Sequence, residues 1–354
     1  MPIKVLVVDD SLLVRTVMTR VLETLPEFEL VGTASNGKEA LEMTARLCPD
    51  VITMDIEMPE MNGLEALALI MNQMPTPVVI MSSHSKPDTD LTIQALELGA
   101  VDFITKPHPI FSRKIVEVSD EIIMKLKTAS LIEVKRNHIG LSHPPDDTRQ
   151  IWKKFTSPPS RSANRTFKRV ISIGVSTGGP TALRTISQAL PPDIEAAILV
   201  VQHMPVGFTK ALADRLNGIS RVDVKEAEDG DPICPGRIFL ARGGYHLCVE
   251  KNSNHHFLRL NRRKRVSFFR PSIDVLMQST AELFAQNNIG VIMTGMSADG
   301  VEGVKAIKKN RGIVIAQDEK TSAIFGMNKL AIQSGMVDHV VPLDRIVPTL
   351  LRYM

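Results

Sequence analysis

Ser176 lies in a pattern that can supply a catalytic nucleophile. The segment Gly174-Val175-Ser176-Thr177-Gly178 fits G-x-S-x-G and comes at the end of the apolar run Val170–Val175. Glycines after the serine allow a sharp turn, and Pro180 suits the first position of a helix. The N-terminus of that helix would offer free N–H groups to an oxyanion. Alone the motif is a weak signal, because similar turns also bind phosphate or have no catalytic role.

A serine nucleophile needs a base, and the base needs an acid that orients it. His203 follows the apolar run Ala197–Gln202, and Asp299 comes shortly after the run Ile289–Thr294. For Asp299 the alternative interpretation is an N-cap of the helix predicted over Val301–Lys309. The resulting order of serine, histidine and aspartate differs from the order of ordinary α/β-hydrolases.

A second set of polar residues follows the apolar runs of the first third of the chain. Asp9 and Asp10 follow the first run, Asp55 the third, Ser82 the fourth and Lys106 the fifth. Crowded carboxylates repel one another unless a cation lies among them, and few hard oxygen ligands suit Mg²⁺. A lysine and a hydroxyl nearby can pair with a phosphoryl group. A single acid at a strand end is equally well a solvated cap, but five positions at successive strand ends favour a site.

Both sets of residues depend on short β-branched runs that alternate with helical patterns. In the first block these predict strands at Ile3–Val8, Leu30–Ala34, Val51–Met54, Val78–Met81 and Val101–Ile104, with a closing helix near 116–131. In the last block they predict strands at Val170–Val175, Ala197–Gln202, Gly236–Leu240, Ile289–Thr294, Ile313–Gln317 and Val337–Val341. Segment 245–270 is predicted as a hairpin. The fold class is therefore α/β, with two doubly wound, mainly parallel sheets whose ligand sites lie beyond the carboxyl ends of the strands.

Charge divides the 354 residues into three regions. Residues 1–122 carry 9 basic and 19 acidic residues, a net charge of −10, whereas residues 123–168 carry a net charge of +7 and residues 169–354 one of +6. The middle region contains His143-Pro144-Pro145 and Ser157-Pro158-Pro159, which are typical of an extended linker. We therefore predict a domain over 1–122, a basic linker over 123–168 and a second domain over 169–354.

Composition excludes several classes of protein. Three cysteines, Cys48, Cys234 and Cys248, cannot build a disulfide framework, and we expect them to be buried as small apolar residues in a reducing cytoplasm. His339 interrupts an apolar run and is predicted as a core histidine. No run of 18 uncharged apolar residues is present, so no membrane insertion is expected.

The first block resembles response-regulator receiver domains. The resemblance rests on Asp9-Asp10, on Asp55 with the following Met58-Pro59-Glu60-Met61-Asn62-Gly63, on Ser82 and on Lys106-Pro107. It implies a flavodoxin-like domain with a five-stranded parallel sheet, in which Asp55 accepts a phosphoryl group from a histidine kinase. It also implies that Asp9, Asp10, Asp55 and the backbone carbonyl of Glu57 hold Mg²⁺. Ser82, Phe103 and Lys106 take the positions of the receiver switch residues.

The last block resembles the catalytic domain of the CheB methylesterases of chemotaxis. The matching stretches are Ile173–Gly179, Val201–Pro205, Pro271–Asp274 and Thr294–Gly300. The resemblance implies Ser176 as nucleophile, His203 as general base and acid, and Asp299 as the orienting acid. It further implies Thr177 as a site residue and the backbone N–H of Met296 as an oxyanion donor. The chain has Ser297 and Val175 where the family usually has Gly and Ala.

The two resemblances together imply a phosphorylation-activated enzyme. It would demethylate glutamate methyl esters on methyl-accepting chemotaxis receptors and also deamidate receptor glutamines, with no cofactor for the hydrolytic step. A chemotaxis histidine kinase would be the phosphodonor. The acidic receiver could dock on the basic second domain and shield Ser176 until Asp55 is phosphorylated.

Two rival functions stay open at this stage. The first is a phosphorylation-switched regulator that only binds a partner, and the second is a hydrolase of another small ester or amide. Residues 259–270 carry six basic residues and no acid, which indicates a solvated loop, a surface that steers acidic receptor helices, or contact with nucleic acid. We expect no nucleic-acid partner, because the sequence has no helix-turn-helix or zinc-finger pattern.

Overall fold

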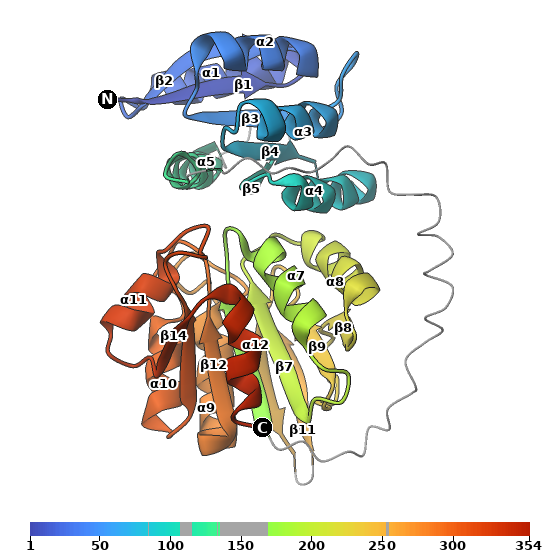
Figure 1. The fold of residues 1–354 in the computed structure, drawn as a ribbon, viewed down its shortest axis with the longest axis vertical. Coiled ribbons are helices and arrows are strands. Elements are labelled where there is room, and N and C mark those ends of the chain that lie inside the picture. Colours follow the sequence, from blue (N-terminus) through green and yellow to red (C-terminus); the bar gives the residue numbers. More distant parts are fainter. Residues whose placement is uncertain (84, 107–114, 133, 135–168, 253–254) are drawn as a thin grey trace. The chain divides into compact units, whose positions relative to one another are not determined.

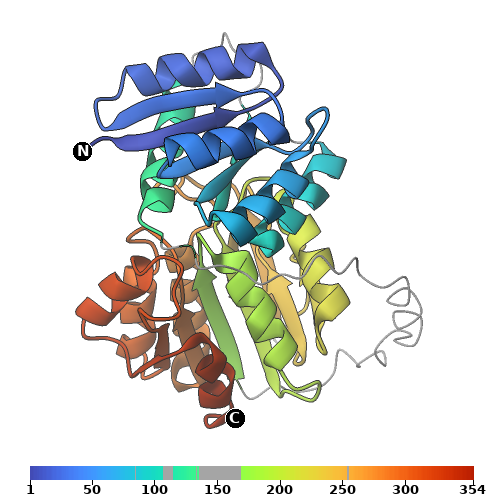
Figure 2. The same cartoon turned by 45° about the horizontal axis from the view of Figure 1, so that its top comes forward.

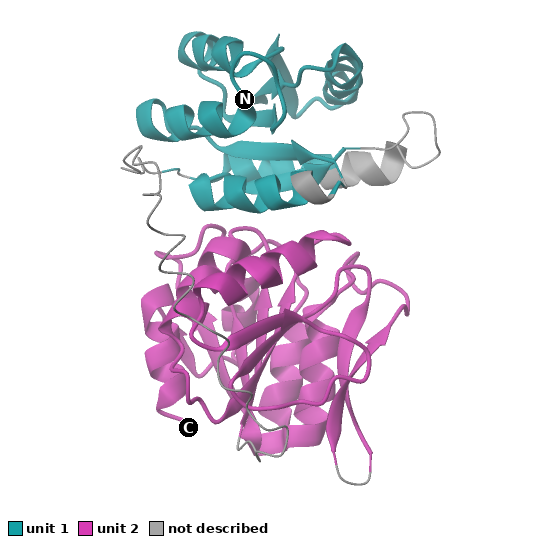
Figure 3. Ribbon diagram, turned by 90° about the vertical axis from the view of Figure 1, so that its right-hand side faces the viewer, with its two compact units in different colours: residues 1–145 teal, residues 146–354 magenta. Residues whose placement is uncertain are grey.

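The computed structural model describes residues 1–83, 85–106, 115–132, 134, 169–252 and 255–354. The chain divides into two compact units, Met1–Pro145 and Asp146–Met354, which Figure 3 shows in different colours. Each unit has its own sheet and its own hydrophobic core. No helix among the described residues is long and apolar enough to cross a membrane.

The first unit contains a five-stranded parallel sheet, as predicted. The strands are β1 (Ile3–Val8), β2 (Phe28–Ala34), β3 (Val51–Asp55), β4 (Val78–Ser82) and β5 (Asp102–Thr105), in the order β2-β1-β3-β4-β5 (Figure 1). Between and after them run α1 (Leu12–Glu23), α2 (Gly37–Leu47), α3 (Gly63–Gln73), α4 (Lys86–Leu98) and α5 (Ile115–Ser130). Helices α1 and α5 pack on one face, and the carboxyl ends of β1, β3 and β5 carry the acidic residues and the lysine.

Helix α5 belongs to the core of the first unit. Ile122, Leu126 and Ala129 are buried among Val5, Val79 and other residues of the sheet. The predicted domain boundary at residue 122 therefore lies inside this helix. Most of the predicted linker, residues 133 and 135–168, lies outside the described residues.

The second unit contains a seven-stranded sheet in the order β14-β13-β12-β6-β7-β9-β8, in which every neighbouring pair is parallel. The strands are β6 (Arg169–Val175), β7 (Ala196–Gln202), β8 (Asp223–Glu226), β9 (Arg237–Leu240), β12 (Asn288–Ile292), β13 (Ile313–Gln317) and β14 (His339–Val341). The predicted hairpin is also present, as the antiparallel pair β10 (His246–Lys251) and β11 (His256–Asn261). Strand β8 was not predicted, because its four residues include three polar ones at the edge of the sheet.

Helices cover both faces of this sheet, which makes it doubly wound. One group consists of α7 (Gly179–Ala189), α8 (Phe208–Ile219) and α12 (Leu343–Leu351). The other consists of α9 (Ile273–Phe284), α10 (Val301–Lys309) and α11 (Met327–Gln333), and a short 3₁₀ turn, η1 (Ala285–Asn287), follows α9. The two groups lie on opposite sides of the sheet in both views (Figure 1 and Figure 2).

The strand order reverses at the centre of the second sheet. Strand β6 pairs with β7 on one side and with β12 on the other, so the chain leaves these three strands in different directions. A crevice forms at such a switch point, outside the carboxyl ends of the strands. The segments that follow β6, β7 and β12 contain Ser176, His203 and Asp299 respectively.

Candidate active site

Ser176 begins the turn between β6 and α7. Its N–H donates to the Thr294 carbonyl at 3.0 Å, and its own carbonyl accepts from the Gly179 N–H at 2.8 Å and from Gln202 Nε2 at 2.9 Å. These bonds fix the main chain of the serine to both neighbouring strand ends. The residue is buried, with 8% of its surface exposed.

Two glycines are required by close contacts around this turn. A Cβ at Gly179 would lie 1.9 Å from Gln202 Oε1, and a Cβ at Gly295 would lie 2.6 Å from the Cβ of Ser176. Gly295 thus brings the main chain that follows β12 directly against the serine side chain. Gly179 and Gly295 therefore allow the main chain to approach closely around Ser176, where a larger residue would clash.

His203 follows β7, and its N–H continues the pairing with β6 by donating to the Val175 carbonyl at 3.1 Å. The imidazole Nε2 lies 2.7 Å from Asp299 Oδ2, and the two side chains are 4% and 0% exposed. One ring face is stacked on Phe269, with centroids 3.8 Å apart and planes inclined by 6°. The histidine is therefore held by an acid at one edge and an aromatic ring on one face.

Asp299 receives hydrogen bonds from the beginning of α9. Its carboxylate accepts from Ser272 Oγ at 2.7 Å, from the Ile273 N–H at 2.7 Å and from the Asp274 N–H at 3.1 Å. Burial by itself raises the pKa of this carboxyl, but the hydrogen bonds that it accepts, that from His203 first, outweigh burial, and the net pKa is lowered. Asp299 is therefore ionised, and it can orient and charge-stabilise the imidazole.

The interpretation of Asp299 as the N-cap of α10 is wrong. The N-cap of α10 is Gly300, and no side chain of the cap residue bonds to the helix. Instead, Asp274 Oδ1 accepts from the N–H groups of Gly300 at 2.9 Å and Gly303 at 2.7 Å. Burial, followed by the charge of Asp299, raises the pKa of Asp274 to about 6.

The partner of Nε2 determines which imidazole nitrogen can act as a base. Because an ionised carboxylate only accepts hydrogen bonds, Nε2 carries the proton and Nδ1 carries the lone pair. Nδ1 is buried and has no hydrogen-bond partner among the described residues. Within the described part of the chain no hydrogen bond joins Ser176 to His203. The two residues nevertheless meet at the end of β6, because the His203 N–H donates to the carbonyl of Val175, which directly precedes Ser176. The arrangement supplies an oriented base whose basic nitrogen is uncommitted.

Thr177 and Met296, the two further site residues expected from the sequence, lie on the segments that enclose Ser176. Thr294 Oγ1 donates to the Thr177 carbonyl at 2.9 Å and accepts from the Ile324 N–H at 3.0 Å. Met296 follows Gly295 and is 39% exposed. Thr177 therefore adjoins Ser176 in the turn, and Met296 adjoins Gly295, whose main chain lies against the serine side chain.

Phe269, Gln202 and Asp274 are parts of the site that sequence reasoning did not assign. Gln202 precedes His203, and Asp274 ends the Pro271–Asp274 motif, so their places beside motif residues were the available signals. Phe269 lies in the basic segment, and nothing in its sequence context marks it as a neighbour of His203. Only the path of the loop brings the two rings together.

The acidic residues of the first unit form a second cluster. Carboxylate oxygens of Asp9, Asp10 and Asp55 lie within 4.8 Å of one another. Lys106 Nζ lies 2.9 Å from Asp9 Oδ2 and 2.8 Å from Asp55 Oδ2. Burial raises the pKa of Asp55 to about 6, Lys106 opposes this shift, and the charge of Asp9 adds to it. One lysine does not neutralise three carboxylates, so the cluster keeps a net negative charge. Its hard oxygen atoms are suitable ligands for Mg²⁺.

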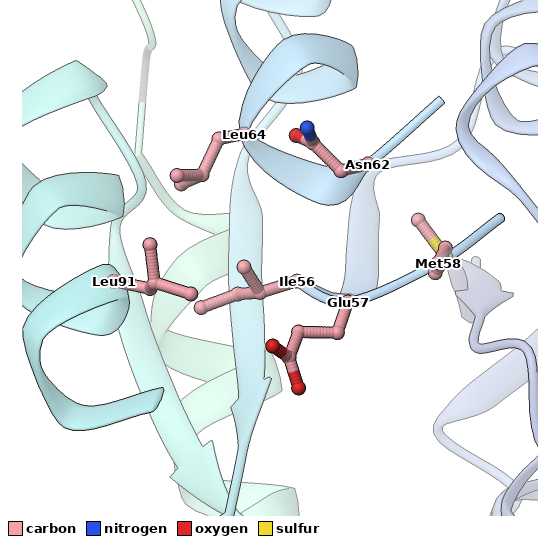
Figure 4. A pocket seen from close by; sticks show the side chains of 6 residues that line it. All are labelled: Ile56, Glu57, Met58, Asn62, Leu64 and Leu91. Carbon is pink, nitrogen blue, oxygen red and sulfur yellow. The ribbon is translucent and has the colours of Figure 1, made fainter. Parts of the chain in front are cut away.

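The other two predicted switch residues, Ser82 and Phe103, lie in the neighbouring strands β4 and β5. Ser82 Oγ accepts from Thr92 Oγ1 at 2.6 Å, and the Ser82 carbonyl accepts from the Lys106 N–H at 2.7 Å. Phe103 is 2% exposed, and the ammonium of Lys125 lies 4.8 Å from its ring centroid. An open pocket begins directly after Asp55 and is lined by Ile56, Glu57, Met58, Asn62, Leu64 and Leu91 (Figure 4).

Comparison with known proteins decides the family. Residues 171–350 match the family described as CheB methylesterase, and residues 5–116 match the response regulator receiver domain. A protein-glutamate methylesterase/protein-glutamine glutaminase of Pyrococcus horikoshii is 45% identical over 351 residues, which cover 99% of this chain and 93% of that protein. The chain belongs to the CheB methylesterase family.

Other members of the CheB family show the same relationship. The protein of that name from Thermotoga maritima is 41% identical over 344 residues, covering 97% of this chain and 96% of its own. The crystal structure of the Thermotoga maritima CheB methylesterase catalytic domain matches with a TM-score of 0.52 and 40% identity, covering 54% of this chain and all of that one. The second unit is thus a CheB methylesterase domain, and the first is a receiver domain.

Two predictions outside the sites of this CheB-family chain need correction. Cys48 is exposed, because it ends α2 in a left-handed conformation at the surface, and Cys234 and Cys248 are only partly buried. His339 is partly exposed as well, and it lies at the edge strand β14, where its Nε2 bonds to the hydroxyl of Tyr353. Short apolar runs at the edge of a sheet do not guarantee burial.

Proposed function

We propose that this chain is a phosphorylation-activated hydrolase that removes methyl esters from glutamates of methyl-accepting chemotaxis receptors. The observation that carries the proposal is the 2.7 Å contact between His203 Nε2 and Asp299 Oδ2, which leaves Nδ1 without a partner beside the Ser176 turn. The curated relatives named methylesterase and glutaminase support the choice of reaction.

The proposed chemistry is acyl transfer through a covalent intermediate. Ser176 Oγ attacks the γ-carbonyl of the esterified glutamate while His203 Nδ1 takes the hydroxyl proton. The same nitrogen delivers this proton to the departing methoxide, so that methanol leaves and an acyl-serine remains. A water molecule, deprotonated by Nδ1, then attacks the acyl carbon. The imidazolium returns this proton to the departing Oγ of Ser176, and the glutamate side chain leaves as an acid that ionises to the carboxylate.

The tetrahedral intermediate places a negative charge on the former carbonyl oxygen. We assign its stabilisation to the backbone N–H of Met296 and to the Thr177 segment, since both border Ser176. Asp299 stabilises the imidazolium that forms in each half of the reaction. A primary amide can enter by the same steps with ammonia as leaving group, so receptor glutamines are proposed as a second substrate.

Regulation is assigned to the receiver. Asp55 is proposed as the acceptor of a phosphoryl group from the chemotaxis histidine kinase, with the protein acting in the cytoplasm. Asp9, Asp10, Asp55 and the Glu57 carbonyl would hold Mg²⁺, which supplies positive charge to the phosphoryl oxygens. Lys106 lies between Asp9 and Asp55 and can pair with the same group. Ser82 and Phe103 are proposed to report the modification to the surface of the receiver.

A methanol-release assay on methylated receptor membranes tests the proposal. The full chain is assayed with and without a small phosphodonor, and Ser176→Ala serves as the control. Release that needs Ser176 and increases with the phosphodonor supports the assignment. Absence of release from receptors, together with hydrolysis of an unrelated ester, would identify a hydrolase of another substrate, and absence of any Ser176-dependent hydrolysis would leave a regulator that only binds a partner.

A further inference from the structure

Within the segment between β11 and α9, residues 262–270 form a tight structured loop, which we call the basic loop. The N–H of Val266 donates to the Phe269 carbonyl at 3.1 Å, and the N–H of Phe269 donates to the Val266 carbonyl at 2.8 Å. The two residues between them, Ser267 and Phe268, have φ angles of 47° and 72°. This is the geometry of a two-residue turn with both central residues left-handed.

The turn is strained in a way that packing does not explain. Asn and Gly are the residues that adopt this conformation readily, whereas a phenylalanine with positive φ is an outlier. Phe268 is nevertheless 90% exposed, so its side chain is hardly packed against the described part of the chain. Such strain is typical of functional segments. Its effect here is that Phe268 lies in solvent while the next residue, Phe269, stacks on His203.

Several hydrogen bonds hold the basic loop in place. Arg270 Nη1 donates to the carbonyls of Arg262 and Arg263, both at 3.1 Å. His246 Nε2 donates to the Lys264 carbonyl at 3.0 Å, and burial lowers the pKa of this histidine. These bonds hold the loop in one conformation before any partner binds. A preorganised loop loses less conformational entropy on binding than a flexible, solvated one.

The cations of the loop form no ion pair among the described residues, although the guanidinium of Arg262 lies 4.6 Å from the ring centroid of Tyr245. Arg262, Arg263, Lys264 and Arg265 are all exposed, and none has an acidic partner among the described residues. By contrast Arg259, just before the loop, pairs with Glu250 at 3.2 Å and with Asp229 at 2.8 Å. Four adjacent cations without an acidic partner repel one another, and an acidic partner relieves that repulsion.

We propose that the basic loop is the surface on which the acidic polypeptide around the target glutamate docks, with Phe268 as its apolar contact. The proposal rests on the proposed function and specifies how that site takes its substrate. Carboxylates that flank the esterified glutamate pair with residues 262–265, and Phe268 packs on the aliphatic part of the same segment. Because Phe269 belongs to the same turn and stacks on His203, docking places the ester beside the base. Each turnover converts a neutral ester into a carboxylate, so the polypeptide becomes more acidic with every glutamate that is hydrolysed.

Comparison of a polypeptide with a small substrate tests this proposal. The full chain, activated with a phosphodonor, is assayed on methylated receptor membranes and on a blocked glutamate γ-methyl ester. The loop variant combines Arg262→Gln, Arg263→Gln, Lys264→Gln and Arg265→Gln. A matched control makes the same change in charge at exposed positions of the same unit, by Lys251→Gln, Lys309→Gln, Lys329→Gln and Arg345→Gln.

We expect the loop variant to lower the ratio of kcat/KM for receptors to kcat/KM for the small ester about tenfold, and to flatten its dependence on salt concentration. The control should keep the wild-type ratio. Equal ratios in wild type and loop variant would overturn the proposal, as would an equal loss in the control. A loop variant that differs from wild type only by a higher rate without phosphodonor would also overturn it, because the loop would then contact the receiver.

Phe268→Gly provides a second variant that does not depend on charge. Glycine accepts a φ of 72° without strain, so the variant should unfold at a higher temperature while its receptor-to-ester ratio falls. A gain in stability with an unchanged ratio contradicts a docking role for the side chain. If the wild-type chain hydrolyses neither substrate, the proposed function itself fails, which is a different result from wild-type activity that the loop does not affect.

Discussion

Asp299 and Asp274 each accept main-chain hydrogen bonds from the helix that begins beside the other. Asp299 accepts from Ile273 and Asp274 at the start of α9, and Asp274 accepts from Gly300 and Gly303 at the start of α10. Helix N-termini favour negative charge, and these bonds lower the pKa of both carboxyls. At Asp274, burial and the charge of Asp299 outweigh them, so its net pKa is raised. These reciprocal hydrogen bonds fix the loop that carries Asp299, and they thereby fix the distance from its carboxylate to His203.

Substitution of the orienting acid should affect the chemical step. Asp299→Asn keeps the size of the side chain but can present an amide N–H to Nε2, which favours the wrong tautomer of His203. We expect kcat to fall by about 10²- to 10⁴-fold, with little change in KM. Ser272→Ala removes only one hydrogen bond from the carboxylate and should cost about tenfold or less. Steady-state kinetics with the small ester measure both, and an Asp299→Asn enzyme with wild-type kcat would contradict this role.

Asp274 should make stability depend on pH. Its folded pKa of about 6 lies above the ordinary value of 3.8, so the folded chain binds the extra proton between these values. This group therefore contributes stability that is complete below pH 4 and is lost as the pH rises through 6. Asp274→Asn keeps an oxygen for Gly300 and Gly303 but cannot ionise.

Urea unfolding at a series of pH values tests this expectation. The difference in unfolding free energy between Asp274→Asn and wild type should shift in favour of the variant as the pH increases from 4 to 7. Asp274→Ala, which also loses the acceptor oxygen, should be destabilised at every pH by about 1–3 kcal/mol. A pH-independent difference for Asp274→Asn would show that Asp274 does not titrate in this range.

The ring of Phe269 should matter for the small ester as well as for receptors. It covers one face of His203 at 3.8 Å and fixes the plane of the imidazole. A ring face also stabilises the imidazolium that forms during the reaction, by about 0.5–2 kcal/mol. We expect Phe269→Leu to lower kcat about tenfold for both substrates, whereas Phe268→Ser should affect receptors much more than the ester. If both variants changed the ratio of receptor activity to ester activity by the same factor, the two phenylalanines would not have these different roles.

Metal binding at the receiver should weaken in acid. The pKa of Asp55, about 6, means that this carboxyl takes up a proton as the pH falls below 6, and Mg²⁺ requires the ionised form. Calorimetric titration of the full chain should give weaker Mg²⁺ binding at pH 5.5 than at pH 7.5. Asp55→Asn should bind Mg²⁺ weakly at both values and lose the response of methanol release to the phosphodonor. Wild-type stimulation in Asp55→Asn would place the modification elsewhere.

An inhibitory receiver predicts a more active fragment. The second unit has its own core, and its relative from Thermotoga maritima crystallised as a catalytic domain, so a fragment from Arg169 to Met354 should fold. If the unphosphorylated receiver shields Ser176, the fragment should hydrolyse receptor esters faster than the unphosphorylated full chain. Equal rates, with both proteins folded by circular dichroism, would exclude the inhibitory role.

Much of the fold follows from local patterns. Runs of β-branched residues predicted all five strands of the first sheet and six of the seven in the second, because strands buried on both faces need continuous apolar segments. Strand β8 was missed because edge strands are short and polar. Burial of Cys48 was predicted wrongly, since a single apolar residue at the end of a helix has no periodic pattern that reports its surroundings.

The sequence by itself determined the two parallel sheets and the polar residues at their strand ends, because hydrophobic periodicity and glycine-rich turns act over a few neighbouring positions. Only the tertiary structure decided that Asp299 bonds to Nε2 of His203, that Asp274 supports the loop of Asp299, and that Phe269 covers the base. These relationships join segments about 25 to 100 residues apart. Their geometry depends on how helices and loops pack across the sheet, which no local pattern encodes.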